Sequence, residues 1–249
     1  MKMIALAMLM AMTPAPVAPE LVALGDSYAA GLGAGDEAQD DCRRSPHAHP
    51  KLWAERNDTS LVFAACAGAT TVEVTRQVER ITPETTLVTI TVGGNDAGFA
   101  DVMTKCTLGG DDECARRVDA AESFIRDELP DRLDGLYAAV RERTSAHVVV
   151  LGYPRLFSFE ERCLLSEPKR KAINRTADVL AEVTEDRAKA AGFDFADVRD
   201  AFDRHGVCAR RPWVNGVVLA PVDRSYHPNR EGQESGYLEV LTDAASRAD

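Results

Sequence analysis

A serine and a histidine stand far apart in the chain, at places suited to a nucleophile and its base. Ser27 comes soon after the short apolar run at residues 21–24, which ends at Gly25, and His227 lies in a compact loop bounded by Pro228. A serine hydroxyl becomes a competent nucleophile when a neighbouring base accepts its proton. The pair therefore predicts nucleophilic catalysis. A serine beside an Asp turn at the start of a helix is an equally ordinary interpretation of the first segment.

Two further residues could stabilise the negative charge that such an attack creates. Gly68 follows the apolar run at residues 60–65, and Asn95 follows two glycines after the run at residues 86–92. A glycine lets its backbone N–H approach a ligand closely, and an asparagine side chain offers an NH₂ donor. Each residue alone fits a plain turn. With Ser27, they would supply three donors to one developing oxyanion.

These residues need a framework that brings them together, and the sequence predicts a parallel sheet. Helical patterns alternate with five short apolar runs, which suit strands covered on both faces. The predicted strands are residues 21–24, 60–65, 86–92, 147–151 and 193–198, and the predicted helices are 72–80, 113–143 with a break near Pro130, 169–191 and 235–247. The pattern indicates an α/β fold, with three α/β/α layers around a doubly wound parallel sheet of about five strands. Ligands bind such sheets at the carboxyl ends of the strands.

Composition limits the classes of protein that the chain can represent. It has 249 residues, 29 Lys and Arg against 40 Asp and Glu, and a formal net charge of −11. The length fits one domain, and the hydrophobic fraction of 45% is that of a globular protein. With no excess of positive charge, a nucleic-acid binder and a polybasic membrane-surface protein are both disfavoured.

The first residues resemble an export signal rather than part of the fold. Lys2 is followed by an uncharged apolar run, residues 3–12, and then by a stretch rich in proline and small residues. This pattern predicts a signal peptide at residues 1–18, cleaved near Ala15 or Ala18, and a catalytic domain at 19–249. Ten apolar residues are about half of the ~20 needed to span a bilayer. We therefore expect an extracellular protein without an integral membrane segment.

The cysteine content agrees with export. The six cysteines are even in number and form no CxxC motif, so a zinc site is disfavoured. Six cysteines allow 15 pairings; sequential pairing is the simplest, joining Cys42–Cys66, Cys106–Cys114 and Cys163–Cys208. The segment His47-Ala48-His49 lacks an apparent third ligand and is interpreted as a solvated loop. No metal or organic cofactor is predicted.

Taken together, these segments resemble the SGNH, or GDSL, hydrolase family. Gly25-Asp26-Ser27-Tyr28 is similar to its nucleophile block, Gly68 to its second block, Gly94-Asn95-Asp96 to its third and His227 to its last. The stretches GGNDAGFADVMTKC and SYHPN, with the six cysteines, look most like the exported actinomycete esterase and lipase branch. The resemblance covers nearly the whole mature chain and implies a flavodoxin-like sheet, three sequential disulfides and a carboxylic-ester hydrolase.

The resemblance also implies a role for each residue. Ser27 would attack the ester carbonyl, His227 would act as its general base, and Ser27, Gly68 and Asn95 would form the oxyanion hole. Most of the family has an Asp three residues before the histidine, but that position here is Arg224, and Asp223 lies one residue further back. In the branch that the chain resembles, a backbone carbonyl replaces the acid. We therefore predict that the carbonyl of Arg224, or that of Ser225, orients His227.

Two alternatives and several details stay open at this point. A nucleophile-elbow α/β-hydrolase is disfavoured because Ser27 lies in Gly-x-Ser-x-Ala on the first strand, not in Gly-x-Ser-x-Gly deep in the chain. A non-catalytic exported binding protein on the same fold is the other alternative. The expected partner is a small-molecule or lipid ester, and a monomer is the default. The sequence leaves open the acyl chain length and whether Asp223 takes part.

Overall fold

The computed structural model describes residues 20–248, so the predicted signal at residues 1–18 lies outside the described residues. A central sheet of five parallel strands has the order β2-β1-β3-β4-β5. The strands are β1 (Glu20–Gly25), β2 (Ser60–Phe63), β3 (Thr85–Thr91), β4 (His147–Leu151) and β5 (Asp194–Ala196). After β1 the chain forms β2 on one flank of β1, and then crosses to form β3 on the other flank. This doubly wound arrangement confirms the predicted α/β class.

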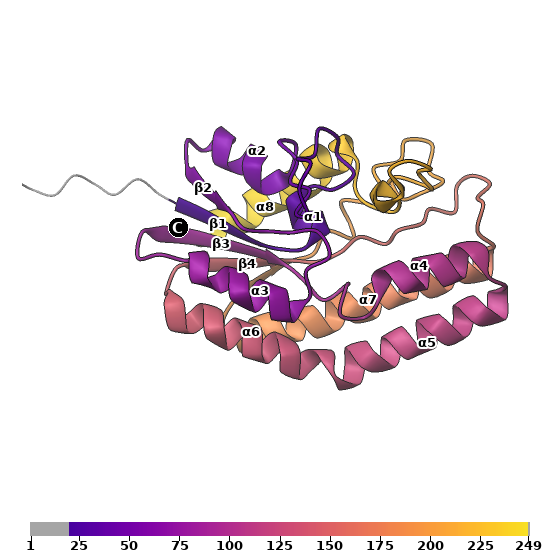
Figure 1. Cartoon of the computed structure of the whole chain (residues 1–249), viewed down its shortest axis with the longest axis horizontal. Coiled ribbons are helices and arrows are strands. Elements are labelled where there is room, and N and C mark those ends of the chain that lie inside the picture. Colours follow the sequence, from indigo (N-terminus) through magenta and orange to yellow (C-terminus); the bar gives the residue numbers. More distant parts are fainter. Residues whose placement is uncertain (1–19, 249) are drawn as a thin grey trace, which may run out of the picture.

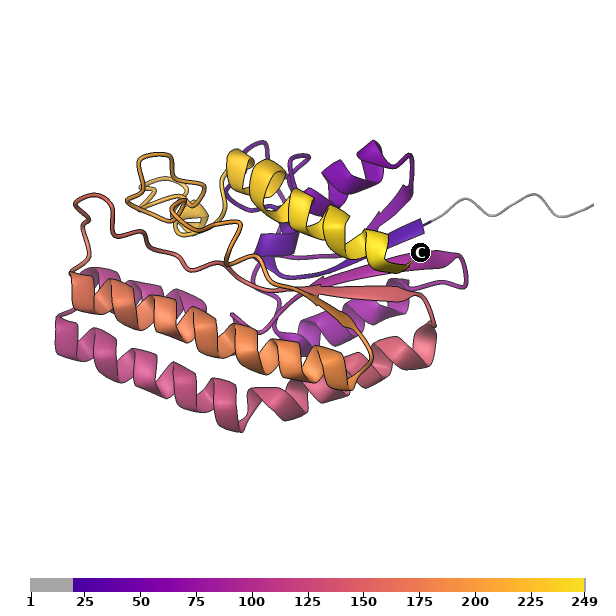
Figure 2. The ribbon, with the colours of Figure 1, turned by 180° about the vertical axis from the view of Figure 1, so that it is seen from behind.

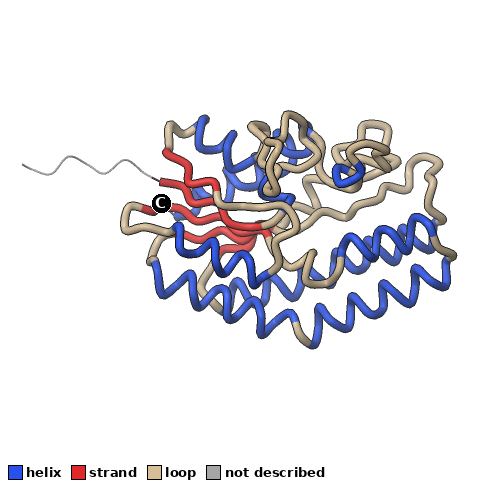
Figure 3. Tube along the Cα trace, in the orientation of Figure 1, coloured by secondary structure: helices blue, strands red, loops and turns tan. Residues whose placement is uncertain are grey.

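Helices cover both faces of the sheet, which gives the three predicted layers (Figures 1 and 2). One layer holds α1 (Ser27–Ala30), α2 (His49–Arg56) and α8 (Leu238–Ala245), and the other holds α3 (Thr71–Gln77), α6 (Leu129–Arg143) and α7 (Glu167–Ala190). The helices α4 (Phe99–Leu108) and α5 (Asp111–Asp127) extend with α7 beyond the carboxyl ends of the strands (Figure 3). Short 3₁₀ helices lie at η1 (Val78–Arg80), η2 (Val222–Arg224) and η4 (Ser246–Ala248), and the π-helix η3 (Gly232–Tyr237) leads directly into α8.

Local sequence explains where the long predicted helix at residues 113–143 breaks. The long helical stretch breaks at Glu128, and Pro130 occupies the first turn of α6, where its missing N–H costs no intrahelical bond. The sequence patterns did not predict α2 and α4, although a helix start at Ser27 was one interpretation of the segment that forms α1. The interpretation of His49 as part of a solvated loop was wrong. His49 opens α2 with its side chain fully buried, and its ring stacks on Tyr237 at 4.8 Å between centroids.

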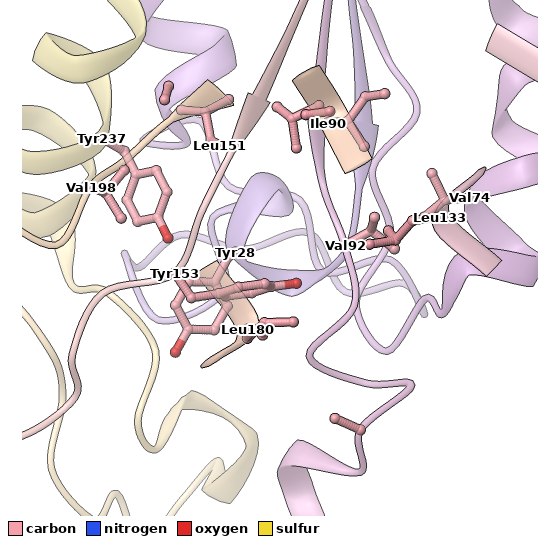
Figure 4. Close-up of a cluster of buried hydrophobic side chains, with 14 of the residues drawn as sticks. Tyr28, Val74, Ile90, Val92, Leu133, Leu151, Tyr153, Leu180, Val198 and Tyr237 are labelled. Atoms are coloured by element: carbon pink, nitrogen blue, oxygen red, sulfur yellow. The ribbon is translucent and has the colours of Figure 1, made fainter. Parts of the chain in front are cut away.

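The core lies on both faces of the sheet, as continuous apolar strands require. Residues 148–151 of β4 are at most 1% exposed, and the cluster continues into the helices of both layers. Figure 4 shows Leu133 beside Val92 on the α6 side, and Tyr28 close to Tyr153 at the end of the sheet. Burial of a large apolar side chain stabilises the fold by about 1.5–3 kcal/mol. The two tyrosines bring hydroxyl groups into this apolar surrounding, and those hydroxyls need partners.

Three disulfides join the cysteines in sequential order, as Cys42–Cys66, Cys106–Cys114 and Cys163–Cys208. The first fastens the loop after α1 to the turn that follows β2, where the backbone N–H of Ala67 also donates to the Cys42 carbonyl at 3.1 Å. The second joins the end of α4 to the first turn of α5. Both therefore act on segments close to the carboxyl edge of the sheet.

Candidate active site

Ser27 lies just beyond the carboxyl end of β1, the strand between β2 and β3, with only Asp26 between them. The Asp26 side chain caps α1 by accepting a hydrogen bond from the Tyr28 N–H at 2.9 Å, so Asp26, and not Ser27, is the N-cap residue. Ser27 is therefore free of a capping role, although it is buried at 6% exposure. The chain moves to opposite sides of the sheet at this point, which is where open α/β sheets form their ligand crevice.

His227 reaches this crevice from a loop 200 residues later in the chain. Its Nε2 lies 2.8 Å from the Ser27 Oγ, and its Nδ1 lies 3.0 Å from the Ser225 carbonyl oxygen. A carbonyl oxygen only accepts hydrogen bonds, so Nδ1 carries the proton and Nε2 keeps its lone pair. The Ser27 hydroxyl must then donate to Nε2. This is the tautomer that a general base needs.

The environment of His227 keeps its ring neutral. The imidazole is 7% exposed and packs against Tyr28 and Phe99, with centroid distances of 5.1 and 5.9 Å. Burial lowers the pKa of His227 to about 4, and the hydrogen bond to Ser225 opposes part of this shift. At neutral pH the ring is therefore ready to accept a proton.

Of the two carbonyls predicted to orient the imidazole, that of Arg224 was the wrong one, and Ser225 supplies the contact. The Arg224 carbonyl closes the turn after η2 by accepting the backbone N–H of His227 at 3.4 Å, so it does not face the imidazole. Asp223 does not take the place of an orienting acid either. Its carboxylate is 45% exposed and pairs with Arg43 at 3.5 Å. The imidazole is thus held by a backbone carbonyl in the described residues.

The Arg224 side chain has a different place, which the sequence did not reveal. Its guanidinium pairs with the fully buried carboxylate of Glu37. Glu37 also accepts hydrogen bonds from the backbone N–H groups of Gly33 and Gly35, at 2.9 and 3.3 Å. A Cβ on Gly33 would lie 2.9 Å from the Cβ of His227. The glycine-rich loop after α1 therefore fits closely against the loop that carries His227, and the ion pair fastens the two together.

Gly68 and Asn95 reach the same edge as Ser27. Gly68 has a φ of +79°, a conformation that glycine adopts at little cost, and no acceptor for its N–H is found among residues 20–248. The Asn95 Nδ2 donates to the Ala69 carbonyl at 3.0 Å, which fixes the amide and leaves its second N–H. Both residues line one groove with Ser27 and His227. The structure thus brings together the four residues that the sequence singled out.

Tyr153 is a residue of this edge that sequence reasoning missed. It follows β4, donates to the Asp26 Oδ2 at 2.5 Å and accepts the Gly94 N–H at 3.3 Å. It therefore links the turn that carries Ser27 to the turn that carries Asn95. Burial raises the pKa of Asp26 to about 7, and the hydrogen bond from Tyr153 limits that rise. Nothing in the sequence around Tyr153 indicates that it links these two turns.

Tyr153→Phe is expected to lower the free energy of unfolding by about 1–3 kcal/mol, because it leaves buried groups without a partner. The loss should be larger at pH 8 than at pH 5, since the bond favours ionised Asp26 and the variant raises the pKa of that carboxyl further. Urea denaturation at both pH values measures it. Tyr137→Phe is the control, because the Tyr137 hydroxyl is buried with no partner in the described chain. Equal losses in both variants would contradict this account.

Two hollows meet at Ser27. A narrow cavity, about 650 Å³ with its opening, extends from Ser27 and Asn95 between α4, α5 and α7. Its walls are apolar and include Val102, Met103, Ile125, Ile173 and Leu180. A wider groove, about 1280 Å³ with its opening, lies on the outer side of Ser27 and His227. The site can therefore hold one apolar group inside the protein while the rest of a molecule stays near solvent.

A doubly wound parallel sheet with a serine and a histidine joined at its switch point defines a three-layer α/β/α hydrolase of the SGNH type. The chain belongs to the GDSL-like lipase/acylhydrolase family, whose model matches residues 23–234. It is therefore a carboxylic-ester hydrolase of the lipase and esterase type. This membership favours an enzyme over a non-catalytic binding protein, and the five-strand parallel sheet with its serine after β1 differs from an elbow-type hydrolase.

Named relatives agree with this class. The chain is 46% identical to Lipase 1 of Streptomyces coelicolor over 230 residues, which are 90% of this chain and 86% of that protein. Its fold is similar to that of phospholipase A1 from Streptomyces albidoflavus NA297, with a TM-score of 0.89 and 45% identity over 91% of this chain and 99% of the other. It is equally similar to the extracellular lipase of Streptomyces rimosus, with a TM-score of 0.88 and 45% identity over 91% and 100% of the two chains.

Proposed function

We propose that the protein hydrolyses carboxylic esters through an acyl-enzyme on Ser27, with His227 as general base. The observation that carries the proposal is the 2.8 Å contact between the Ser27 Oγ and the unprotonated Nε2 of His227. Ser27 attacks the ester carbonyl while His227 accepts its proton. His227 then returns that proton to the leaving alcohol. Water, deprotonated by the same ring, releases the acid and restores Ser27.

The oxyanion of each tetrahedral intermediate is bound by the N–H groups of Ser27 and Gly68 and by the Asn95 amide. Support comes from the Gly68 N–H, which has no acceptor among residues 20–248, and from the hydrogen bond that fixes the Asn95 amide to the Ala69 carbonyl. Donors that are already fixed need no reorganisation when the charge develops, and loss of one typically lowers the rate about 10²–10³-fold. The Ser225 carbonyl holds the imidazole in line, so the catalytic unit is a Ser–His dyad.

The acyl part of the substrate lies in the apolar cavity, and the alcohol part lies in the outer groove. The cavity offers almost purely apolar walls at the point where the acyl carbon must meet Ser27. An alkyl chain gains about 0.8 kcal/mol for each methylene that leaves water. Fatty acyl esters are therefore the favoured substrates. Similarity to a phospholipase A1 and to two Streptomyces lipases supports a lipid ester.

Among p-nitrophenyl esters, kcat/KM is expected to rise from acetate toward longer chains by up to about fourfold per methylene, until the cavity is full. Ala177→Phe places a large ring in the cavity wall formed by α7, so it should abolish this rise and leave acetate hydrolysis nearly unchanged. Ala190→Phe adds the same ring at an exposed position of the same helix and is the control. A flat wild-type profile would contradict the acyl assignment.

We further propose that residues 1–18 direct export and are removed, and that residues 19–249 form the catalytic domain. The extracellular lipase of Streptomyces rimosus and the three disulfides support an oxidising, extracellular destination. None of the helices in residues 20–248 has the length and apolar character of a membrane span. N-terminal sequencing of protein collected from the culture medium of a secreting host tests both statements. A monomer remains the predicted oligomeric state.

A further inference from the structure

Large apolar side chains are exposed around the mouth of the outer groove. Leu219 and Val222 belong to the loop before His227 and are 92% and 68% exposed, and Leu108 at the end of α4 is 82% exposed. Val217, in the same loop, is 45% exposed. Leu108, Val217 and Val222 line the groove that contains Ser27 and His227. We call these four residues the apolar rim. Exposed apolar clusters of this kind mark interaction sites.

The rim is built into a braced loop. The Val218 N–H donates to the Ser225 Oγ at 2.9 Å, and that hydroxyl contacts the Val218 carbonyl at 3.3 Å. At the base of the loop, the backbones of Asn215 and His227 are joined by a hydrogen bond of 2.9 Å. The loop therefore directs Leu219 and its neighbours into solvent while it holds His227 in place. A loop that only positioned His227 would not need apolar tips.

The position of the rim indicates what covers it. The outer groove and the inner cavity share Ser27, Asn95, Phe99 and Met103 as walls, so apolar surface continues from the rim to the acyl cavity. A fatty acyl ester is held in a lipid aggregate, and its chain must cross from that aggregate to Ser27. If the rim rests in the lipid surface, the chain meets apolar groups along the whole path and is not exposed to water.

Charge decides which lipid surface fits. Two acids, Asp41 and Asp223, and one base, Arg43, line the groove beside the rim, and the whole chain carries 29 positive against 40 negative side chains. Such a protein is repelled by anionic lipid, whose surface attracts basic segments. Contact must then come from apolar insertion, which a neutral or zwitterionic surface permits.

We propose that the apolar rim (Leu108, Val217, Leu219 and Val222) inserts into the surface of a neutral or zwitterionic lipid aggregate and places the mouth of the groove over its substrate. The proposal rests on the proposed function and adds the surface from which the enzyme takes its ester. Leu219 is the residue for the test, because it is exposed and does not line the groove or the cavity.

The test separates binding from catalysis. Binding to phosphatidylcholine vesicles is measured by co-sedimentation in a Ser27→Ala background, so that no lipid is hydrolysed. Leu219→Asp is expected to lower the partition coefficient about tenfold or more, because it replaces an inserting side chain with a charge. Val72→Asp, which introduces the same charge at a 51% exposed position of α3 outside the groove, should change the partition coefficient less than twofold. The Ser27→Ala protein without a further change should bind vesicles that contain phosphatidylglycerol more weakly than vesicles of phosphatidylcholine alone.

A second measurement uses the enzyme with Ser27 intact. Leu219→Asp should leave kcat/KM for soluble p-nitrophenyl butyrate within twofold and lower the rate on vesicle-borne ester in proportion to the lost binding. Unchanged vesicle binding, an equal loss on soluble ester, or a dimer that Leu219→Asp dissociates would each overturn the proposal. Failure of the proposed function is recognised separately, because soluble ester hydrolysis would then survive Ser27→Ala.

Discussion

Replacement of Ser27 with alanine is expected to lower kcat for p-nitrophenyl butyrate by about 10⁴–10⁶-fold and to change KM little. The methyl group removes the attacking oxygen, while the acyl cavity and the oxyanion donors remain in place. The remaining rate would come from binding and from the donors alone, with water attacking directly. Steady-state kinetics of the two proteins, checked for equal folding by circular dichroism, measure the loss.

Covalent labelling identifies the reacting oxygen. A fluorophosphonate should add one phosphonyl group to the peptide that carries Ser27, with loss of fluoride, and the alanine variant should not react. Ser45→Ala is the matched control, because Ser45 is also buried and donates from its Oγ to the Gly35 carbonyl at 2.6 Å. That variant should be labelled and active, at some loss of stability. A labelled and active Ser27→Ala protein would remove the basis of the mechanism.

Strand positions and the residues that follow the strands were predictable because both depend on short segments. Each predicted strand contains or overlaps the observed one, since a strand buried on both faces needs an uninterrupted apolar run. Parallel strands place their carboxyl ends at one edge, so Ser27, Gly68 and Asn95 had to approach one another. His227 could be chosen because its loop is short, proline-bounded and close to the last helix. The family resemblance supplied the roles.

Contacts between loops could not be predicted in the same way. Which carbonyl meets the imidazole depends on backbone rotation at Arg224 and Ser225, and every residue type has a carbonyl. Glu37 and Tyr153 act through partners far away in the sequence, at separations of 187 and 127 residues. No local pattern marks such pairs. His49 was misjudged for a related reason, since its burial results from packing of α2 against Tyr237.

His227→Ala is expected to lower kcat by about 10⁴-fold or more, and Asp223→Asn by less than threefold. The histidine is the base that contacts the Ser27 Oγ, whereas the Asp223 carboxylate is half-exposed and pairs with Arg43. A surface pair of this kind contributes little. Kinetics of both variants on one soluble ester give the comparison. A collapse of kcat in Asp223→Asn would mean that an acid, and not the Ser225 carbonyl, orients the ring.

The pH dependence of kcat/KM tests the same dyad without a change to His227. Only the neutral ring accepts the Ser27 proton. The value of kcat/KM should therefore stay constant from neutral pH down to the lowered pKa of His227, about 4, and fall tenfold per pH unit below it. Asp26, with its pKa raised to about 7, is the competing source of an acid limb. Tyr153→Phe separates the two, because it raises the pKa of Asp26 and does not touch the imidazole. A midpoint near 7 that moves upward in this variant would assign the limb to Asp26, and a midpoint near 4 that stays fixed assigns it to His227.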